Sequence, residues 1–335
     1  MSAGTAEPAA ALRRLRVDVA DLVARAREGQ ARAVARLISL VEDASPQLRE
    51  VAAALAPYAG SAQVIGLTGP PGVGKSTSTA ALVSAYREAG HRVGVLAIDP
   101  SSPFSGGALL GDRVRMQVHA TDPGVFIRSM ATRGHLGGLS WAAPQALRVL
   151  DAAGFGVILI ETVGVGQSEV DVVSLADTTL VLVAPGMGDG IQAAKAGILE
   201  IADVFVVNKA DRDGADRTAR ELKHMISLGR REISGPAWRP PVVRTIADQR
   251  SGIADVIEAI AAHRDWLVTN GALARRRLHR AQTEVEAIAM QTLRERMGNL
   301  DGSSALTALA RRVADGDLDP YAGADELVHT LDHQG

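Results

Sequence analysis

Through the middle of the chain, short apolar runs alternate with stretches that have the period of a helix. The runs span residues 64–67, 93–98, 125–127, 157–160, 180–183, 204–207 and 242–243. They are continuous rather than alternating in hydrophobicity, which is typical of strands buried on both faces of a parallel sheet. The pattern predicts an α/β domain over residues 61–268, in which helices flank a mainly parallel sheet. Ligands of such folds bind at the carboxyl ends of the strands.

On either side of this region the pattern is purely helical. Residues 1–60 predict two or three small helices, the third starting at Ser45-Pro46 because proline is favoured in a first turn. Residues 269–335 predict a long helix over 273–297 and two short ones over 305–313 and 324–331. A domain this small cannot bury the apolar stripe of the long helix, so we expect the extension to pack on a second subunit. Near its start, Arg275, Arg276, Arg277 and Arg280 predict a solvated helix face, with an anion-binding patch as the alternative.

The amino-acid composition argues against several kinds of site and partner. Hydrophobic residues fill 47% of the 335 positions, which is ample for a core, and the length suggests a main domain with appendages. The formal net charge of −2 gives no reason to expect nucleic acid or a membrane surface as a partner. The lack of cysteine excludes disulfides, thiolate zinc sites and cysteine nucleophiles. No apolar run has membrane-spanning length and no signal peptide is evident, so we expect a cytoplasmic protein.

A glycine-rich loop follows the first apolar run and fits the pattern G-x-x-x-x-G-K-[ST]. It consists of Gly69, Pro70, Pro71, Gly72, Val73, Gly74, Lys75 and Ser76, with Thr77 next in line. The order of strand, loop and helix is the context of a P-loop, whose N–H groups and helix N-terminus bind phosphates. Lys75 would reach the β- and γ-phosphates, and the Ser76 hydroxyl would bind Mg²⁺. The alternative is a turn that merely starts a helix.

Asn208-Lys209-Ala210-Asp211 directly follows the run 204–207 and predicts the base that is bound. The aspartate of an N-K-x-D motif accepts hydrogen bonds from N1–H and the exocyclic amine of guanine. Adenine has no such donor pair, so the carboxylate discriminates against it. Asn208 would tie neighbouring loops together, and the Lys209 stem would pack on the base plane. A match at the end of a late strand, after a P-loop, favours GTP over ATP.

The run 157–160 ends in Glu161-Thr162-Val163-Gly164, where the second acidic motif of P-loop enzymes belongs. The Glu161 carboxylate could orient a Mg²⁺-bound water, although aspartate is usual there; a surface glutamate at a strand end is the alternative. Val165 stands where many GTPases place the glutamine that orients the attacking water, so we expect slow intrinsic hydrolysis. Gln167 is the nearest substitute.

Further candidate residues lie in loops beside the P-loop. Asp99 and Asp112 flank a loop rich in glycine, serine and proline, as a nucleotide-sensing switch with Mg²⁺ ligands would require; structural turn aspartates are equally common. Arg128 and Arg133 could contact phosphates or a partner, or form ordinary ion pairs.

A third candidate switch follows the run 180–183. Residues 184–190 contain three glycines and Asp189, and Lys195 comes just after them. Lys195 is one of only four lysines among 36 basic residues, which suggests a role that arginine does not fill. A plain strand-to-helix connection is the alternative.

Taken together, these motifs resemble the MeaB/ArgK family, the bacterial relatives of the human protein deficient in cblA-type methylmalonic aciduria. The signatures are GPPGVGKST, AIDPSSPFSGGALLGDRVRM, IRSMATRGHLGGLS, ETVGVGQSE and NKAD. The resemblance implies a SIMIBI-class P-loop GTPase that binds GTP and GDP with Mg²⁺. It also implies a homodimer formed through the C-terminal helical arm. Such proteins act as chaperones of an adenosylcobalamin-dependent acyl-CoA mutase, typically methylmalonyl-CoA mutase, gating cofactor loading and protecting the mutase.

The resemblance also implies roles for single residues. It assigns Mg²⁺ to Ser76, Asp99, Asp112 and Glu161. It makes residues 177–195 a third switch, in which Asp189 and Lys195 would signal to the mutase. The last guanine-contacting loop of the family is usually Ser-Ala, but here the chain reads Thr245-Ile246-Ala247, so only the Ala247 N–H carries over.

Two other functions stay open. Older family naming suggests a kinase acting on an amino-acid transport protein, but no residues supply a site for a protein substrate. A passive scaffold with a relic nucleotide site is the other, and the intact Lys75, Ser76 and Asp211 argue against it.

Overall fold

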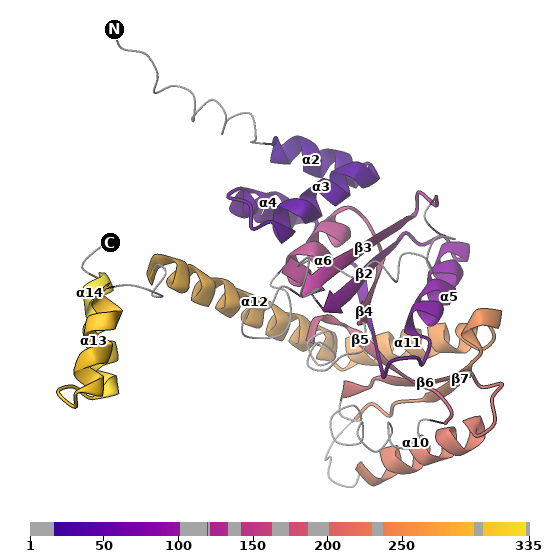
Figure 1. The fold of residues 1–335 in the computed structure, drawn as a ribbon. Helices are drawn as coiled ribbons and strands as arrows, with labels where there is room; N and C mark the ends of the chain where they lie inside the picture. The colour runs from indigo at the N-terminus through magenta and orange to yellow at the C-terminus, as the bar shows by residue number, and fades with distance from the viewer. Residues whose placement is uncertain are drawn as a thin grey trace. The chain divides into compact units, whose positions relative to one another are not determined.

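All seven apolar runs form strands of one sheet in the computed structural model (Figure 1). The structure describes residues 17–100, 119, 121–132, 142–162, 174–186, 201–229, 237–297 and 304–332. The strands are β1 (Gln63–Thr68), β2 (Val93–Pro100), β3 (Val125–Thr132), β4 (Val157–Thr162), β5 (Thr178–Val183), β6 (Val204–Asn208) and β7 (Val242–Thr245). Every neighbouring pair is parallel, in the order β3-β2-β4-β1-β5-β6-β7. The predicted parallel α/β sheet is confirmed.

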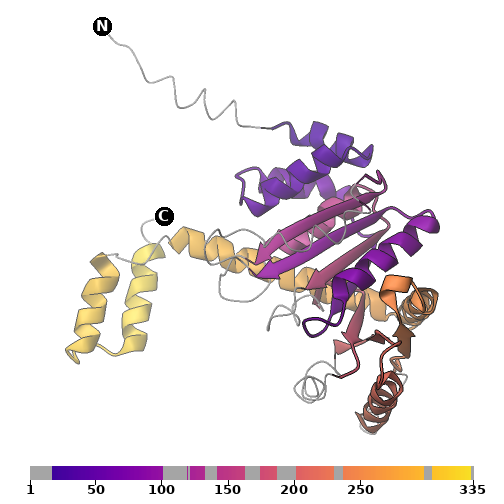
Figure 2. The ribbon, with the colours of Figure 1, turned by 45° about the vertical axis from the view of Figure 1, so that its right-hand side comes forward.

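Helices cover both faces of this sheet (Figures 1 and 2). On one face, α5 (Lys75–Glu88) and α11 (Ile253–Thr269) bury apolar residues of the central strands, such as Leu67 and Leu159. The other face is covered by α6 (Ala142–Ala152) over β2 and β4, and by α10 (Ala215–Gly229) over β5 and β6. Since both faces are buried there, the central strands β1, β4, β5 and β6 are rich in apolar residues.

The N-terminal helices are α2 (Val19–Arg27), α3 (Ala31–Glu42) and α4 (Leu48–Leu55), followed by the short η1 (Ala56–Tyr58). They share one apolar core with α6 and the sheet, as predicted for small helices packed on a larger body. Arg128 of β3 forms an ion pair with Glu42 of α3, so the ion-pair alternative holds for this residue.

The predicted start of the third helix at Ser45-Pro46 is wrong, because α4 begins at Leu48. The Ser45 carbonyl accepts the Leu48 N–H at 3.0 Å, and its hydroxyl accepts the Gln47 N–H at 3.2 Å. These bonds form a turn that precedes the helix.

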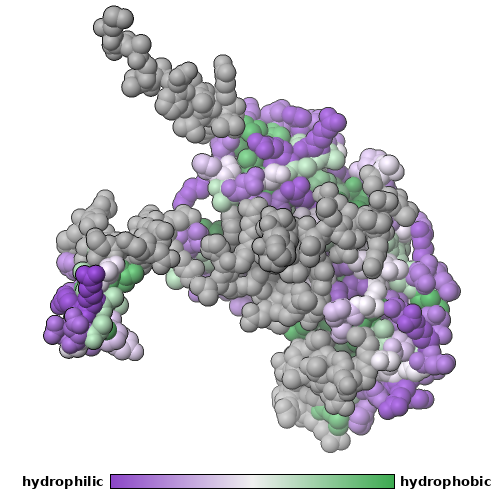
Figure 3. Space-filling view, viewed as in Figure 1, coloured by the Kyte–Doolittle hydropathy of each residue, from purple (hydrophilic) through white to green (hydrophobic). Residues whose placement is uncertain are grey.

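The chain divides into two compact units, Met1–Arg277 and Leu278–Gly335. The long helix α12 (Ala272–Met297) passes from one to the other, and α13 (Ser304–Ala314) and α14 (Pro320–Asp332) complete the second unit. Pro320 is the first residue of α14, four positions before the predicted start, and the Asp319 carboxylate caps the helix by accepting the Tyr321 N–H at 2.9 Å. Figure 3 shows hydrophilic and apolar residues side by side on the visible face of this unit.

The predicted solvated face at the start of α12 is wrong for Arg277, which is half-buried, whereas Arg276 is exposed. Both guanidinium groups contact carboxylates whose side chains are at most 9% exposed. By contrast, Leu278, Val285, Ile288 and Leu293 are exposed, as predicted for an apolar stripe with no place in a compact domain. None of the described helices is long and apolar enough to cross a membrane.

Candidate nucleotide site

The glycine-rich loop connects the end of β1 to the first turn of α5 at the centre of the sheet. Gly69 has φ +140° and lies so close to β5 that a Cβ atom would collide with the Leu182 carbonyl oxygen. Gly74 has φ +96°, and a Cβ there would lie 2.5 Å from Nδ2 of Asn208. Side chains are therefore excluded at both positions by the approach of neighbouring strands, and the loop has the strand–loop–helix context of a P-loop.

Lys75 is the first residue of α5 and is only 7% exposed. Its Nζ donates hydrogen bonds to the carbonyl oxygens of Gly69, at 2.5 Å, and Pro70, at 3.1 Å. The ammonium group thus lies against the loop itself, at the positive end of the helix. Both features favour an anion at this position.

Ser76 and Glu161 meet beside the loop. The Ser76 hydroxyl donates a hydrogen bond of 2.6 Å to Oε1 of Glu161, and the two residues are 6% and 1% exposed. Strand register explains the meeting, since Glu161 of β4 lies opposite Leu67 of β1, two residues before Gly69. Asp99 occupies the end of β2, two residues beyond Ala97, which also lies opposite Glu161. The Ser76 hydroxyl and the Glu161 carboxylate are oxygen donors of the kind that Mg²⁺ prefers, so these two side chains fit that ion.

Asn208 joins three loops at the opposite side of the glycine-rich loop. Its Nδ2 donates to the Val73 carbonyl at 2.8 Å, and its Oδ1 accepts from the Thr245 hydroxyl and the Ala247 N–H, both at 3.1 Å. The side chain is buried. The structure confirms that this asparagine ties the loops together. The Ala247 amide is engaged in that tie, so its contact with a guanine stays a prediction.

Lys209 and Asp211 flank the same loop. Lys209 adopts φ +58°, and its Nζ donates to the Gly72 carbonyl at 2.7 Å, so the side chain lies across the end of the P-loop. Asp211 is exposed, and within the described part of the chain its carboxylate has no hydrogen-bond or ion-pair partner. Recognition of a base by the Lys209 stem and the Asp211 carboxylate stays a prediction.

Several predicted residues lie outside the described part of the chain. These are Asp112, Arg133, Val165, Gln167, Asp189 and Lys195, together with the side chain of Asp99. Among the described candidates, the structure brings together Lys75, Ser76 and Glu161 on one side of the P-loop, and Asn208, Lys209 and Ala247 on the other.

The sequence interpretation missed one member of the loop network. Thr245 has a buried hydroxyl bonded to Asn208, and its carbonyl accepts the Ala210 N–H at 3.0 Å. The polar residue at the end of an apolar strand was the available signal, because the carboxyl ends of neighbouring parallel strands meet at one edge.

Comparisons with known proteins agree with this geometry. The family model described as methylmalonyl-CoA mutase-associated GTPase MeaB matches residues 34–300. A Pyrococcus abyssi protein whose name describes it as a GTPase is 47% identical over 93% of this chain and 96% of its own length. The mouse protein named methylmalonic aciduria type A homolog, mitochondrial, is 34% identical over 90% of this chain and 76% of its own length.

A solved structure shows the same fold. The crystal structure of a LAO/AO transport system kinase aligns with a TM-score of 0.70 and 27% identity, covering 95% of this chain and 99% of its own. Both the fold and the extent of the family match include the P-loop and the Asn208 loop. The chain belongs to the MeaB family of methylmalonyl-CoA mutase-associated GTPases.

Proposed function

We propose that this GTPase is a chaperone of an adenosylcobalamin-dependent acyl-CoA mutase, with methylmalonyl-CoA mutase as the first candidate. GTP hydrolysis would gate cofactor loading and protect the mutase from inactivation. The observation that carries the site assignment is the position of Asn208, which joins the P-loop to both loops expected around a guanine. The mutase is supported by the family's description and by the name of the mouse relative.

The nucleotide would lie along the loop from Gly69 to Thr77. Backbone N–H groups of this loop and the start of α5 would bind the phosphates, and Lys75 would exchange its two carbonyl contacts for the β- and γ-phosphates. Asp211 would accept hydrogen bonds from guanine, while Lys209 would hold the base plane from the position it already occupies over Gly72.

Mg²⁺ would be held, directly or through water, by Ser76, Glu161, Asp99 and Asp112. A bound Mg²⁺ would neutralise charge on the β- and γ-phosphates. The short bond between Ser76 and Glu161 keeps both oxygens beside the P-loop, which supports these two residues as ligands.

Hydrolysis would proceed by attack of water on the γ-phosphate. Lys75 and the P-loop amides would stabilise the charge that develops. With Val165 at the usual glutamine position and Gln167 as the nearest substitute, intrinsic turnover would be slow, and a partner would complete the site. Asp189 and Lys195 would transmit nucleotide state to that partner.

We also propose a homodimer formed through the C-terminal helices. The exposed apolar residues of α12 support it, because an exposed stripe on a long helix is a common contact surface; they are Leu278, Val285, Ile288, Met290 and Leu293. Sedimentation should show twice the chain mass, and Leu278→Glu combined with Val285→Glu should shift the protein to the monomer.

The proposed function is tested by measuring GTP hydrolysis with and without purified methylmalonyl-CoA mutase and a related acyl-CoA mutase. We expect one of them to bind and to raise turnover. If neither mutase binds or changes turnover, the chaperone role is wrong.

A kinase is the second candidate, because the solved relative is named as a transport system kinase. With γ-labelled GTP and candidate acceptors, a kinase would yield a labelled product. We expect the label in inorganic phosphate alone.

A further inference from the structure

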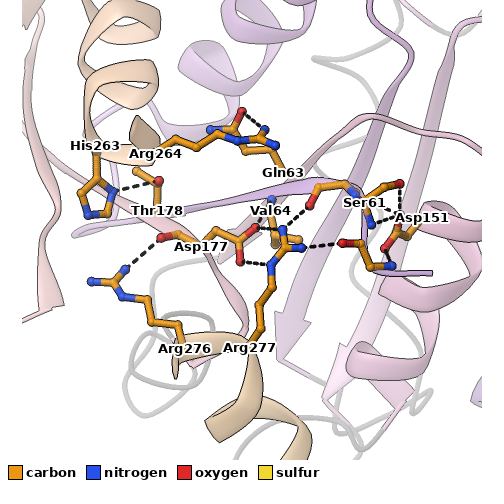
Figure 4. A network of polar contacts seen from close by, with 12 residues as sticks. Ser61, Gln63, Val64, Asp151, Asp177, Thr178, His263, Arg264, Arg276 and Arg277 are labelled. Carbon is orange, nitrogen blue, oxygen red and sulfur yellow. Dashed lines mark hydrogen bonds and ion pairs between the residues drawn. The ribbon is translucent and has the colours of Figure 1, made fainter. Parts of the chain in front are cut away.

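Two adjacent arginines fasten the start of α12 to the edge of the sheet opposite the nucleotide site (Figure 4). Arg276 donates two hydrogen bonds to the Asp203 carboxylate, at 2.8 and 2.9 Å, and a third to the Asp177 carbonyl at 2.8 Å. Arg277 donates to the Asp177 carboxylate at 3.0 Å, to the Ala62 carbonyl at 2.9 Å and to the Gly60 carbonyl. We call these two arginines and two aspartates the clamp.

The clamp joins two buried carboxylates to two arginine side chains that are partly exposed, 40% for Arg276 and 25% for Arg277. The side chains of Asp177 and Asp203 are 4% and 9% exposed. Burial raises the pKa of Asp203, but its hydrogen bonds to Arg276 and His263 outweigh this effect and hold the pKa below its ordinary value. Removing one partner from such a network leaves an uncompensated buried charge, which is far more costly than the loss of an exposed ion pair. The clamp therefore fixes the positions of the backbone segments that it contacts.

The clamp contacts the amino ends of three strands. The Asp177 carboxylate also accepts the Val64 N–H of β1 at 3.1 Å, and Asp203 accepts the Thr179 N–H of β5 at 2.9 Å. Asp203 itself immediately precedes β6. At their carboxyl ends, β1 leads into the P-loop and β6 into the Asn208 loop, while Asp177 connects β5 to the segment that follows Glu161.

The same three strands contact one another tightly at the nucleotide end. Gly69, after β1, packs against the Leu182 carbonyl of β5, and Gly74 packs against Asn208 of β6. Neither contact leaves room for a Cβ atom. A small change in the relative position of the strands at the clamp would therefore alter the geometry of the P-loop about 20 Å away, given about 3.3 Å per strand residue.

We propose that Arg276 and Arg277 are positioning residues that couple guanine-nucleotide binding to the start of α12. The clamp connects the start of α12 to the amino ends of β1, β5 and β6, and the nucleotide loops depend on the positions of the same three strands. Coupling is reciprocal, so nucleotide binding must stabilise the clamp as much as the clamp improves nucleotide binding. The inference rests on the nucleotide site proposed above and does not involve the mutase.

The chain provides its own reporter for this coupling. The indole N–H of Trp238 donates to the Asp203 carbonyl at 2.7 Å, and the Trp238 and Trp266 rings lie 4.9 and 6.2 Å from the His263 ring. His263 in turn lies 3.2 Å from Asp203. In a Trp141→Phe background these two tryptophans are the only ones left, so their emission reports on the clamp.

The experiment uses the full-length Trp141→Phe protein with GDP and a non-hydrolysable GTP analogue. We expect tryptophan emission to change on nucleotide addition. The test variant combines Arg277→Met with Asp177→Asn, which removes both charges of the pair together and so avoids an unpaired buried carboxylate. We expect this variant to retain a cooperative unfolding transition, to lose most of the emission change and to bind nucleotide at least about 5-fold more weakly, the lower end of usual coupling.

Arg275→Ala is the matched control, because Arg275 is the adjacent residue and contacts only the Asn270 carbonyl, at 3.2 Å, in the described network. It should behave like the parent. The inference is overturned if the double variant binds nucleotide and changes its emission as the parent does, or if the parent binds nucleotide by calorimetry without any emission change. Absence of calorimetric binding by the parent would overturn the nucleotide site itself, and the coupling with it.

Discussion

Asn208 donates a hydrogen bond of 2.8 Å to the backbone carbonyl of Val73, and this bond joins the loop after β6 to the P-loop. The two residues are 135 positions apart in the chain. Because the same side chain also accepts bonds from the loop after β7, its amide determines the spacing of three loops at once.

We expect Asn208→Ala to weaken binding of GDP and GTP equally. The change leaves the Val73 carbonyl, the Thr245 hydroxyl and the Ala247 N–H without their partner, and each buried orphan costs about 1–3 kcal/mol. Calorimetry should show an affinity loss of at least about 10-fold, corresponding to about 1.4 kcal/mol. Asn270→Ala is the control, because the Asn270 side chain donates to the Trp266 carbonyl at the end of α11, away from the P-loop. Unchanged affinity in Asn208→Ala would contradict the bridging role.

Asp211 should decide which base is bound. Asp211→Asn removes the acceptor for two guanine N–H groups, so GTP affinity should fall by about 100-fold or more, while xanthosine triphosphate, which offers a carbonyl in place of the amine, should bind better than to the parent. Competition binding with GTP, ATP and xanthosine triphosphate measures this. The exposed Asp213 offers a control in Asp213→Asn. A variant that still prefers GTP would refute the assignment.

Alanine substitutions at two P-loop glycines can distinguish the effect of backbone strain from the effect of a steric collision. Gly72 and Gly74 both have positive φ, +79° and +96°, but a Cβ at Gly72 meets nothing within 4 Å, whereas one at Gly74 reaches Asn208. Gly72→Ala should lower the free energy of unfolding by about 1–2 kcal/mol. Gly74→Ala should cause a similar loss of stability, and its nucleotide affinity should be several-fold lower than that of Gly72→Ala. Equal affinities in the two variants would show that the Asn208 contact is unimportant.

Glu161→Gln tests the proposed Mg²⁺ site. The amide oxygen can still accept the Ser76 hydroxyl bond, so the fold should be preserved, but the negative charge is lost. We expect the Mg²⁺ concentration for half-maximal hydrolysis to rise and the maximal rate to fall by at least about 10-fold. Glu88→Gln, which alters an exposed pair with Arg250, is the control. An unchanged Mg²⁺ titration would remove Glu161 from the metal site.

Acid should destabilise the protein through the clamp. The pKa of Asp203 is lowered in the folded state: burial raises it, but the bonds from Arg276 and His263 prevail. A carboxylate with a depressed folded pKa stabilises the fold above its unfolded pKa, and this contribution is lost as the pH falls through the folded value. Urea titrations should show the free energy of unfolding falling below about pH 5. The decline should be shallower in Asp203→Asn and unchanged in Asp213→Asn. Parallel pH profiles for the parent and Asp203→Asn would contradict this source of acid sensitivity.

Local sequence patterns predicted the sheet well and some helix starts poorly. Each apolar run became a strand, because residues buried on both faces of a sheet have no alternative to being apolar. The starts of α4 and α14 were misplaced by a few residues, because the turn at Ser45 and the cap at Asp319 depend on local hydrogen bonds that hydrophobic periodicity does not report.

The sequence by itself determined the parallel α/β fold, the P-loop, the guanine motif and the family, since each depends on residues that are adjacent in the chain or at strand ends. Only the tertiary structure decided that Glu161 meets Ser76, that Thr245 supports Asn208, and that Arg276 and Arg277 bind buried acids. An arginine on a helix has the same local pattern whether its face is solvated or packed. Its partner is chosen by strand order and register, which bring together residues that are far apart in the chain.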